Sequence, residues 1–131
     1  MPYFDYNATT PPLPAALAAA RETAEQAWHN PSSPYRASAR AHALLDEARE
    51  QLAALLGGAA EQYVFTSGAT ESNNAVFAHF AKTSAPNSRA IVSAIEHPSV
   101  LEAAQAWFPH RVSLIPVHDH GVADLASLEK L

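Results

Sequence analysis

The sequence predicts an α/β protein built on a parallel sheet, because short apolar runs of strand length alternate with helical patterns. Three runs have strand composition, at residues 64–66, 89–95 and 112–117, and a helical pattern follows each of them. Strands linked in this way run parallel through right-handed crossovers. Hydrophobic residues make up 48% of the 131 residues and charged residues 16%, which is typical of a globular chain that buries a core.

The N-terminal part of the sequence predicts an arm, a turn and two helices. Residues 3–12 alternate aromatic and polar side chains and end at paired prolines, which favours an extended arm. A helix is expected over residues 14–28, since proline is tolerated at its first position. Residues 30–34 have turn composition, and Ser33 is the expected cap of the next helix. That helix spans residues 35–56, has a solvated polar face and ends at a glycine pair.

The junction between the first predicted strand and its helix carries the strongest chemical signal. Gly68 lets backbone approach a ligand closely, and a helix is predicted over residues 69–82. The first amides of such a helix are unpaired and lie at the positive end of its dipole, which predicts an anion site, most often for phosphate. Hydroxyl groups near this point are further candidate donors, or else only helix caps: Ser67, Thr70 and Ser72.

The remaining sequence predicts two more strand and helix pairs. The strand at residues 89–95 leads through Glu96-His97-Pro98-Ser99 into a helix that ends near Trp107. The strand at residues 112–117 is followed by a turn and by a last helix that Asp124 caps. Residues 67–70 and 96–97 both follow strand ends, so we expect them at the same edge of the sheet. The helix that starts at residue 69 is largely apolar, which favours burial against the sheet.

Four motifs in this chain closely resemble the N-terminal part of cysteine desulfurases, in the class V aminotransferase family of fold-type I pyridoxal phosphate enzymes. They are Phe4-Asp5-Tyr6-Asn7-Ala8-Thr9-Thr10-Pro11, Asn30-Pro31-Ser32-Ser33, Phe65-Thr66-Ser67-Gly68-Ala69-Thr70-Glu71-Ser72-Asn73-Asn74 and Glu96-His97. The resemblance covers essentially the whole chain but only the first part of such an enzyme. It implies a three-layer α/β/α fold with a mainly parallel sheet. Residues 1–33 would form an N-terminal arm, helix and turn, and residues 34–131 the start of the cofactor-binding large domain.

The resemblance also implies roles for individual residues. Gly68, Ala69 and Thr70 match the positions that bind the phosphate of pyridoxal 5'-phosphate, through backbone N–H groups and the threonine hydroxyl. His97 matches the histidine that stacks on the pyridine ring of the cofactor and helps with proton transfer at the substrate carbon. Tyr35 and Ser38 stand where desulfurases commonly carry a histidine and a glycine, which leaves the exact substrate open.

The activity that the resemblance implies is the removal of sulfur from L-cysteine, giving alanine and an enzyme persulfide for sulfur transfer, as in iron-sulfur cluster assembly. It also implies a homodimer, and a sulfur-acceptor protein as a partner. Selenocysteine lyases and class V aminotransferases share the early motifs and remain alternatives within this class. A non-catalytic dimerisation or interaction module is an alternative outside it.

Several groups that the resemblance requires have no counterpart in the sequence: the Schiff-base lysine segment, the aspartate that pairs with the ring nitrogen, and the persulfide cysteine. Lys82 lies about 18 Å along the helix from Thr70 at a rise of about 1.5 Å per residue, far beyond the reach of its side chain. Lys130 has no motif around it. We therefore expect the chain alone to be inactive and to bind free pyridoxal phosphate poorly.

Composition excludes several other classes of protein. A net charge of −5 with eight basic residues argues against nucleic acid and membrane surfaces as partners, and the absence of cysteine excludes disulfides and thiolate metal sites. The sequence carries no signal-peptide or membrane-span pattern, so a cytoplasmic location is expected. His118-Asp119-His120 suggests a zinc site, but the glycine after it favours a turn. The remaining histidines lack ligand spacing: His29, His42, His79 and His110.

Overall fold

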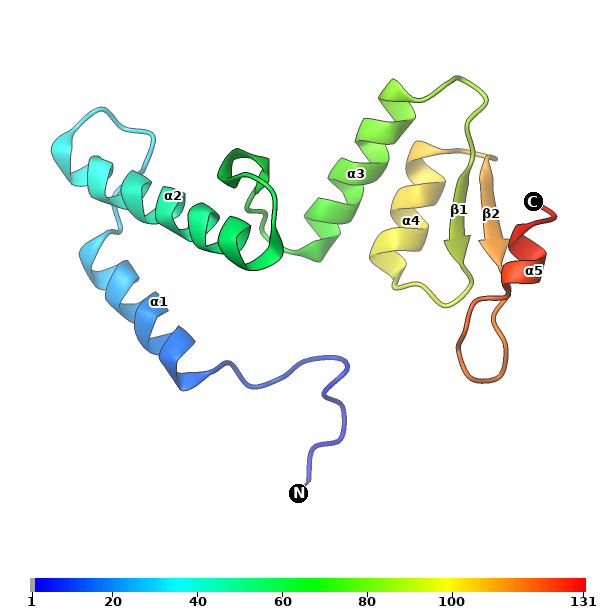
Figure 1. Cartoon of the computed structure of the whole chain (residues 1–131), viewed down its shortest axis with the longest axis horizontal. Helices are drawn as coiled ribbons and strands as arrows, with labels where there is room; N and C mark the ends of the chain where they lie inside the picture. The colour runs from blue at the N-terminus through cyan, green and yellow to red at the C-terminus, as the bar shows by residue number, and fades with distance from the viewer. Residues whose placement is uncertain (1) are drawn as a thin grey trace. The chain divides into compact units, whose positions relative to one another are not determined.

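The computed structural model describes residues 2–131, which form five α-helices, one short 3-10 helix and two strands (Figure 1). The chain divides into two compact units, one that ends at Val64 and one from Phe65 to Leu131. The N-terminal unit contains α1 (Pro14–Gln26), α2 (Arg36–Leu56) and η1 (Ala60–Gln62). The C-terminal unit contains α3 (Ala69–Thr83), β1 (Ala90–Ser93), α4 (Pro98–Trp107), β2 (Val112–Ile115) and α5 (Leu125–Leu128).

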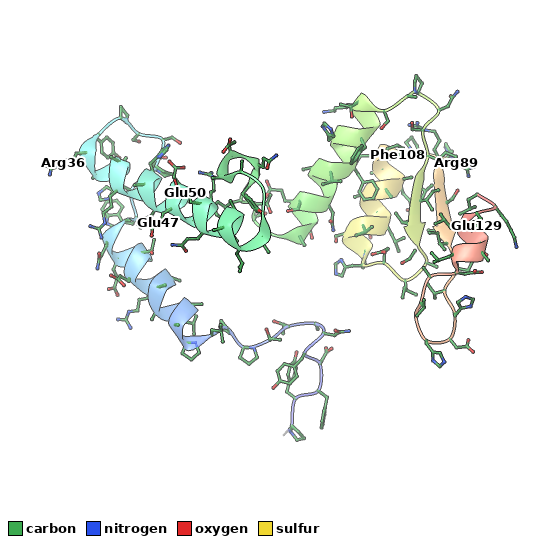
Figure 2. The ribbon with its side chains drawn as sticks, in the orientation of Figure 1. Arg36, Glu47, Glu50, Arg89, Phe108 and Glu129 are labelled. Atoms are coloured by element: carbon green, nitrogen blue, oxygen red, sulfur yellow. The ribbon has the colours of Figure 1, made fainter. Side chains whose placement is uncertain are left out.

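Both predicted helices of the N-terminal unit are confirmed, although α1 ends two residues earlier than expected. α1 starts with Pro14 in its first turn. α2 ends at Gly57, whose φ of 88° belongs to the left-handed region that glycine adopts readily. The acidic side chains of Glu47 and Glu50 on α2 are exposed, as its polar face predicted (Figure 2).

The cap predicted at Ser33 is wrong. The N-cap of α2 is Tyr35, which makes no capping hydrogen bond with its side chain. Ser33 instead belongs to the turn before the helix, where its amide donates to the Asn30 carbonyl at 3.2 Å. The Asn30 side chain closes the same turn by accepting from the Ser32 amide at 2.9 Å, which is the turn chemistry that asparagine favours. The predicted turn is therefore confirmed, and it uses the serine that was expected to cap the helix.

The C-terminal unit is built on a small parallel sheet. β1 pairs with β2 in parallel, with Ala90 opposite Val112 and Ser93 opposite Ile115. One face of this sheet packs against α4, which α3 covers in turn, while Ile91 on the opposite face is 43% exposed (Figure 1). The buried core consists of Ala90, Val92, Ala104 and Phe108, and partly buried apolar side chains from α3, α4 and β2 pack around it.

Two predictions about this unit are wrong. Residues 64–66 form no strand, and Val64 is 80% exposed, because strand composition yields a ladder only where a partner strand is available. In the described sheet, β1 and β2 pair only with each other. The helix α3 was expected to be buried against the sheet, but it contains no buried residue, and Val76 and Phe80 are 53% and 54% exposed. It packs mainly on α4 instead.

The end of the chain folds as predicted. Residues 118–121 form a turn, in which the Gly121 amide donates to the His118 carbonyl at 2.8 Å. The carboxylate of Asp124 caps α5 by accepting from the amides of Ala126 and Ser127 at 3.0 and 3.2 Å. No helix within residues 2–131 is long and apolar enough to cross a membrane.

Candidate functional site

The start of α3 is the predicted anion site, and no side chain caps it. Helical hydrogen bonding begins at Ser72, whose amide donates to the Gly68 carbonyl at 3.2 Å. The backbone at Gly68 is extended, with φ 163° and ψ 177°, and a Cβ atom there would meet nothing within 4 Å. The glycine thus leaves open space beside the first amides of the helix. Amides in this position attract anions through their unpaired N–H groups and the helix dipole.

Two of the three hydroxyls that were candidate anion donors are engaged inside the protein. The amide and hydroxyl of Ser67 donate to Glu71 Oε2 at 2.7 and 2.8 Å. The hydroxyl of Ser72 lies 2.7 Å from the hydroxyl of Thr66. Within residues 2–131, the Thr70 hydroxyl has no such internal bond, so it is the hydroxyl that remains for a ligand at this point.

Glu71 adds a negative charge to the first turn of α3. Hydrogen bonds from the Ser67 backbone N–H and hydroxyl lower the pKa of the Glu71 carboxyl below its ordinary value. A carboxylate in this turn is favourable for the helix dipole, and it takes both donors of Ser67. The donors of this segment that Glu71 leaves available to an anion are therefore those after Ser67.

The start of α4 is organised differently, because His97 caps it. Its Nδ1 atom accepts from the Ser99 amide at 3.1 Å and lies 2.9 Å from the Ser99 hydroxyl. Pro98 occupies the first helical position and has no N–H to satisfy. The next amide, that of Val100, donates to the His97 carbonyl at 2.9 Å. The first amides of α4 are thus satisfied internally, while those of α3 lack a side-chain cap.

A side chain that the sequence reasoning did not single out joins the two helix starts. Asn73, in the second turn of α3, donates through Nδ2 to the Ser99 hydroxyl at 3.0 Å. This contact links the second turn of α3 to the first turn of α4. That residues 67–70 and 96–97 lie at the same edge of the sheet stays a prediction. His97 is exposed, whereas Ser99 and Asn73 are partly buried. The sequence does signal the His97 cap, through the order His-Pro-Ser, since proline at the first helical position marks the residue before it as the cap.

The other candidate residues lie away from this point. Lys82 is in the last turn of α3, with its Nζ 5.5 Å from the centre of the Trp107 ring, so it cannot replace a Schiff-base lysine at the helix start. Residues 118–121 form a turn, and no group of three potential metal ligands exists within residues 2–131. Tyr35 is 53% exposed, and Ser38 is fully buried in α2.

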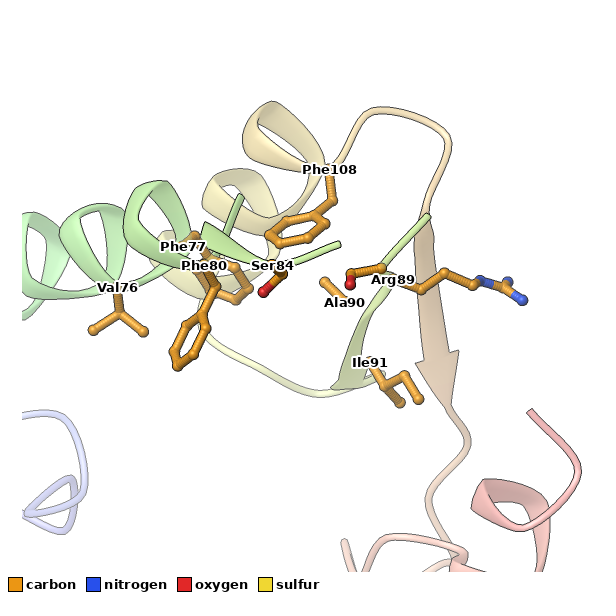
Figure 3. A pocket seen from close by; sticks show the side chains of 9 residues that line it. Val76, Phe77, Phe80, Ser84, Arg89, Ala90, Ile91 and Phe108 are labelled. Carbon is orange, nitrogen blue, oxygen red and sulfur yellow. The ribbon is translucent and has the colours of Figure 1, made fainter. Parts of the chain in front are cut away.

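A separate cavity of about 220 Å³ opens between α3, β1 and the end of α4 (Figure 3). Its wall is mainly apolar and includes Val76, Phe77 and Phe80 from α3, with Phe108 from the core. Arg89 at its margin donates to the Ser113 hydroxyl at 2.6 Å. No residue of the two helix starts lines this cavity, so it is distinct from the predicted site.

The family to which these features point is matched along nearly the whole chain. The Aminotransferase class-V family matches residues 2–131. The chain therefore belongs to the class-V aminotransferase family, whose enzymes depend on pyridoxal phosphate.

Within this family, the chain is similar to selenocysteine lyases and cysteine desulfurases. The chain is 40% identical to a selenocysteine lyase of Bos taurus over 121 residues, which covers 89% of this chain and 26% of that protein. It is 36% identical to the cysteine desulfurase IscS 1 of Archaeoglobus fulgidus, covering 99% of this chain and 35% of that protein. A solved NifS-like protein matches 98% of this chain and 36% of its own, with a TM-score of 0.85 and 35% identity. The chain spans only about a quarter to a third of the length of these relatives.

Proposed function

We propose that this chain is the phosphate-holding N-terminal part of a cysteine desulfurase-like enzyme that uses pyridoxal 5'-phosphate. The observation that carries the proposal is the uncapped start of α3, with open space at Gly68 and an available hydroxyl at Thr70, in a chain of the class-V family. The hydrogen bond from Asn73 to Ser99 supports it, because it links α3 to the serine that contacts the His97 ring.

The residues present suit the cofactor. Gly68, Ala69 and Thr70 would hold its phosphate through backbone amides and one hydroxyl, with the dipole of a 15-residue helix behind them. The exposed imidazole of His97 would stack on its ring. When bound, the cofactor supplies the electron sink for bond cleavage at the substrate carbon. The protein part described here would supply binding and orientation, since it lacks a cysteine and its lysines lie elsewhere.

The complete activity is proposed for a polypeptide that adds further segments of the three-layer α/β/α domain. Such a polypeptide would take sulfur from L-cysteine, release alanine and pass the sulfur from a persulfide to an acceptor protein, as a homodimer. The open face of the sheet at Ile91 supports this proposal, since a three-layer domain covers both faces. A cytoplasmic location stays a prediction.

A selenocysteine lyase is the second candidate, because relatives with that name are 38% to 40% identical to the chain over most of its length. The two functions differ in how the longer polypeptide would act on L-cysteine. A desulfurase would release alanine from cysteine, while a lyase specific for selenocysteine would leave cysteine intact.

Phosphate binding is tested by titrating the chain with pyridoxal phosphate and following the backbone amides by NMR. We expect the amides of Ala69 and Thr70 to shift with pyridoxal phosphate and not with pyridoxal, which lacks the phosphate. Thr70→Ala should weaken this binding about tenfold or more, since a charge-assisted hydrogen bond contributes about 1.5 to 3 kcal/mol. Thr83→Ala is the matched control in the last turn of the same helix. Equal affinity in both variants would contradict the assignment of Thr70.

The prediction that the chain alone is inactive needs a separate assay. The chain is mixed with pyridoxal phosphate and cysteine, and alanine and sulfide are measured against the cofactor alone. We expect no release above that background and only weak cofactor binding, because the covalent and ring-nitrogen anchors are not in this chain. Sedimentation with and without the cofactor separates the enzyme proposal from an interaction module, for which oligomerisation would not depend on the cofactor.

A further inference from the structure

We infer that Ser99 and Asn73 are positioning residues that fix His97 as the neutral tautomer with its proton on Nε2. Nδ1 of His97 accepts from the Ser99 amide at 3.1 Å. A backbone N–H can only donate, so Nδ1 must offer a lone pair and the ring proton must lie on Nε2. The Ser99 amide makes this bond to the His97 ring whatever the direction of the Ser99 hydroxyl proton.

The Ser99 hydroxyl reinforces the same tautomer. Its oxygen lies 2.9 Å from Nδ1 and accepts from Asn73 Nδ2 at 3.0 Å. Because the Ser99 amide already requires an unprotonated Nδ1, the hydroxyl can bond to this atom only as a donor, with its proton directed at the ring. Consecutive hydrogen bonds polarise one another, so the hydrogen bond that Asn73 donates to Ser99 strengthens the one from Ser99 to His97. Both supporting side chains are partly buried, which limits competition from water.

This arrangement determines what His97 can do in the proposed enzyme. The lone pair of Nδ1 is occupied by Ser99, and Nε2 carries a proton, so the neutral ring has no free acceptor atom. His97 therefore meets a group near Nε2 as a hydrogen-bond donor. This role rests on the proposed function, but the tautomer itself belongs to the chain without any cofactor.

The tautomer is measured by NMR of the chain labelled with ¹⁵N in histidine, without cofactor, at a pH about two units above the ordinary histidine pKa near 6.5. We expect a large shift difference between Nδ1 and Nε2 of His97. It should exceed that of His120, which is exposed in its turn and has no ring hydrogen bond within residues 2–131 to select one tautomer. A His97 difference equal to that of His120 would overturn the inference. A spectrum without amide dispersion would also count against it, because the geometry would then be absent.

Variants separate positioning from general stability. Ser99→Ala should reduce the shift difference of His97 and leave that of His120 unchanged, while Ser99→Thr should restore it because it keeps the hydroxyl. Asn73→Asp should shift the population toward a proton on Nδ1, since a carboxylate accepts the hydroxyl proton of Ser99.

Asn74→Ala is the matched control, because the Asn74 side-chain amide donates to the Thr70 carbonyl at 3.0 Å and makes no hydrogen bond to Ser99 within residues 2–131. If Asn73→Ala and Asn74→Ala change His97 equally, Asn73 has no positioning role. If the Ala69 and Thr70 amides do not respond to pyridoxal phosphate while His97 keeps its proton on Nε2, the proposed function is contradicted and this inference still holds.

Discussion

The core residue Phe108 offers the sharpest test of how the C-terminal unit is held together by its buried core. Its ring is 4% exposed, meets Phe77 edge to face at 6.4 Å between centres and lies 5.2 Å from the Arg111 guanidinium carbon. Phe108→Ala removes this ring from a core of only four buried residues. A buried Phe→Ala substitution costs about 3 to 5 kcal/mol through lost burial and the cavity that remains.

That loss is large compared with the stability that the unit can have. Domains are stable by about 0.05 to 0.15 kcal/mol per residue, which gives about 3 to 10 kcal/mol for the segment from Phe65 to Leu131. Its small core favours the lower end of this interval. We therefore expect Phe108→Ala to abolish cooperative unfolding of the C-terminal unit at room temperature or to lower its urea midpoint drastically.

Urea unfolding followed by Trp107 fluorescence checks this prediction. Trp107 packs against the core, and a Trp28→Phe background removes the other tryptophan, which belongs to the N-terminal unit. Phe80→Ala is the matched control, since the same atoms are removed from a ring that is 54% exposed. The reasoning is refuted if the two variants lose equal stability, because burial would then not decide the cost.

Three other outcomes follow from the glycines and from Glu71. Gly57→Ala should destabilise the N-terminal unit by about 1 to 3 kcal/mol in urea unfolding followed by Trp28, because φ 88° with ψ 174° is open essentially to glycine alone. Gly68→Ala should change stability by less than about 0.5 kcal/mol, because its extended backbone suits any residue and no atom lies within 4 Å of the new Cβ. The Glu71 bonds to Ser67 lower the Glu71 pKa, so their stabilisation is complete above the unfolded pKa near 4.3 and is lost as pH falls through the lower folded value. Amide exchange at Ser67 should speed up over that acidic interval, and Glu71→Gln should remove this pH dependence.

The helices could be predicted from the sequence because their signals are local. Prolines 14 and 98 mark the first turns of α1 and α4, and Gly57 marks the end of α2, so the chain itself carries the start and stop information. The parallel pair of β1 and β2 was predictable for a related reason, since two apolar runs on either side of a helix favour that connection.

The features that could not be predicted from the sequence depend on contacts between residues far apart in the chain. Residues 64–66 have strand composition, yet a strand needs a neighbour, and composition does not say whether one is present. Asn73 and Ser99 are 26 residues apart, so their hydrogen bond follows from the packing of α3 on α4. The hydrogen bonds of Ser67 could have been predicted from the sequence. Glu71 lies four residues later, in the first turn of α3, where its carboxylate can accept from the Ser67 amide and hydroxyl.

The first backbone N–H groups of α3 and α4 have different partners. α4 satisfies its first amide with the ring of His97, so capping the helix and fixing the tautomer are a single event. α3 leaves its first amides without a side-chain cap, and its carboxylate turns back to Ser67 rather than onto them. A helix start is costly to leave unsatisfied when it is buried, but Ala69 and Thr70 are exposed, so water can solvate these amides until an anion replaces it. The difference between capped and uncapped amides is therefore the physical reason why we propose phosphate binding at α3 and proton placement at α4.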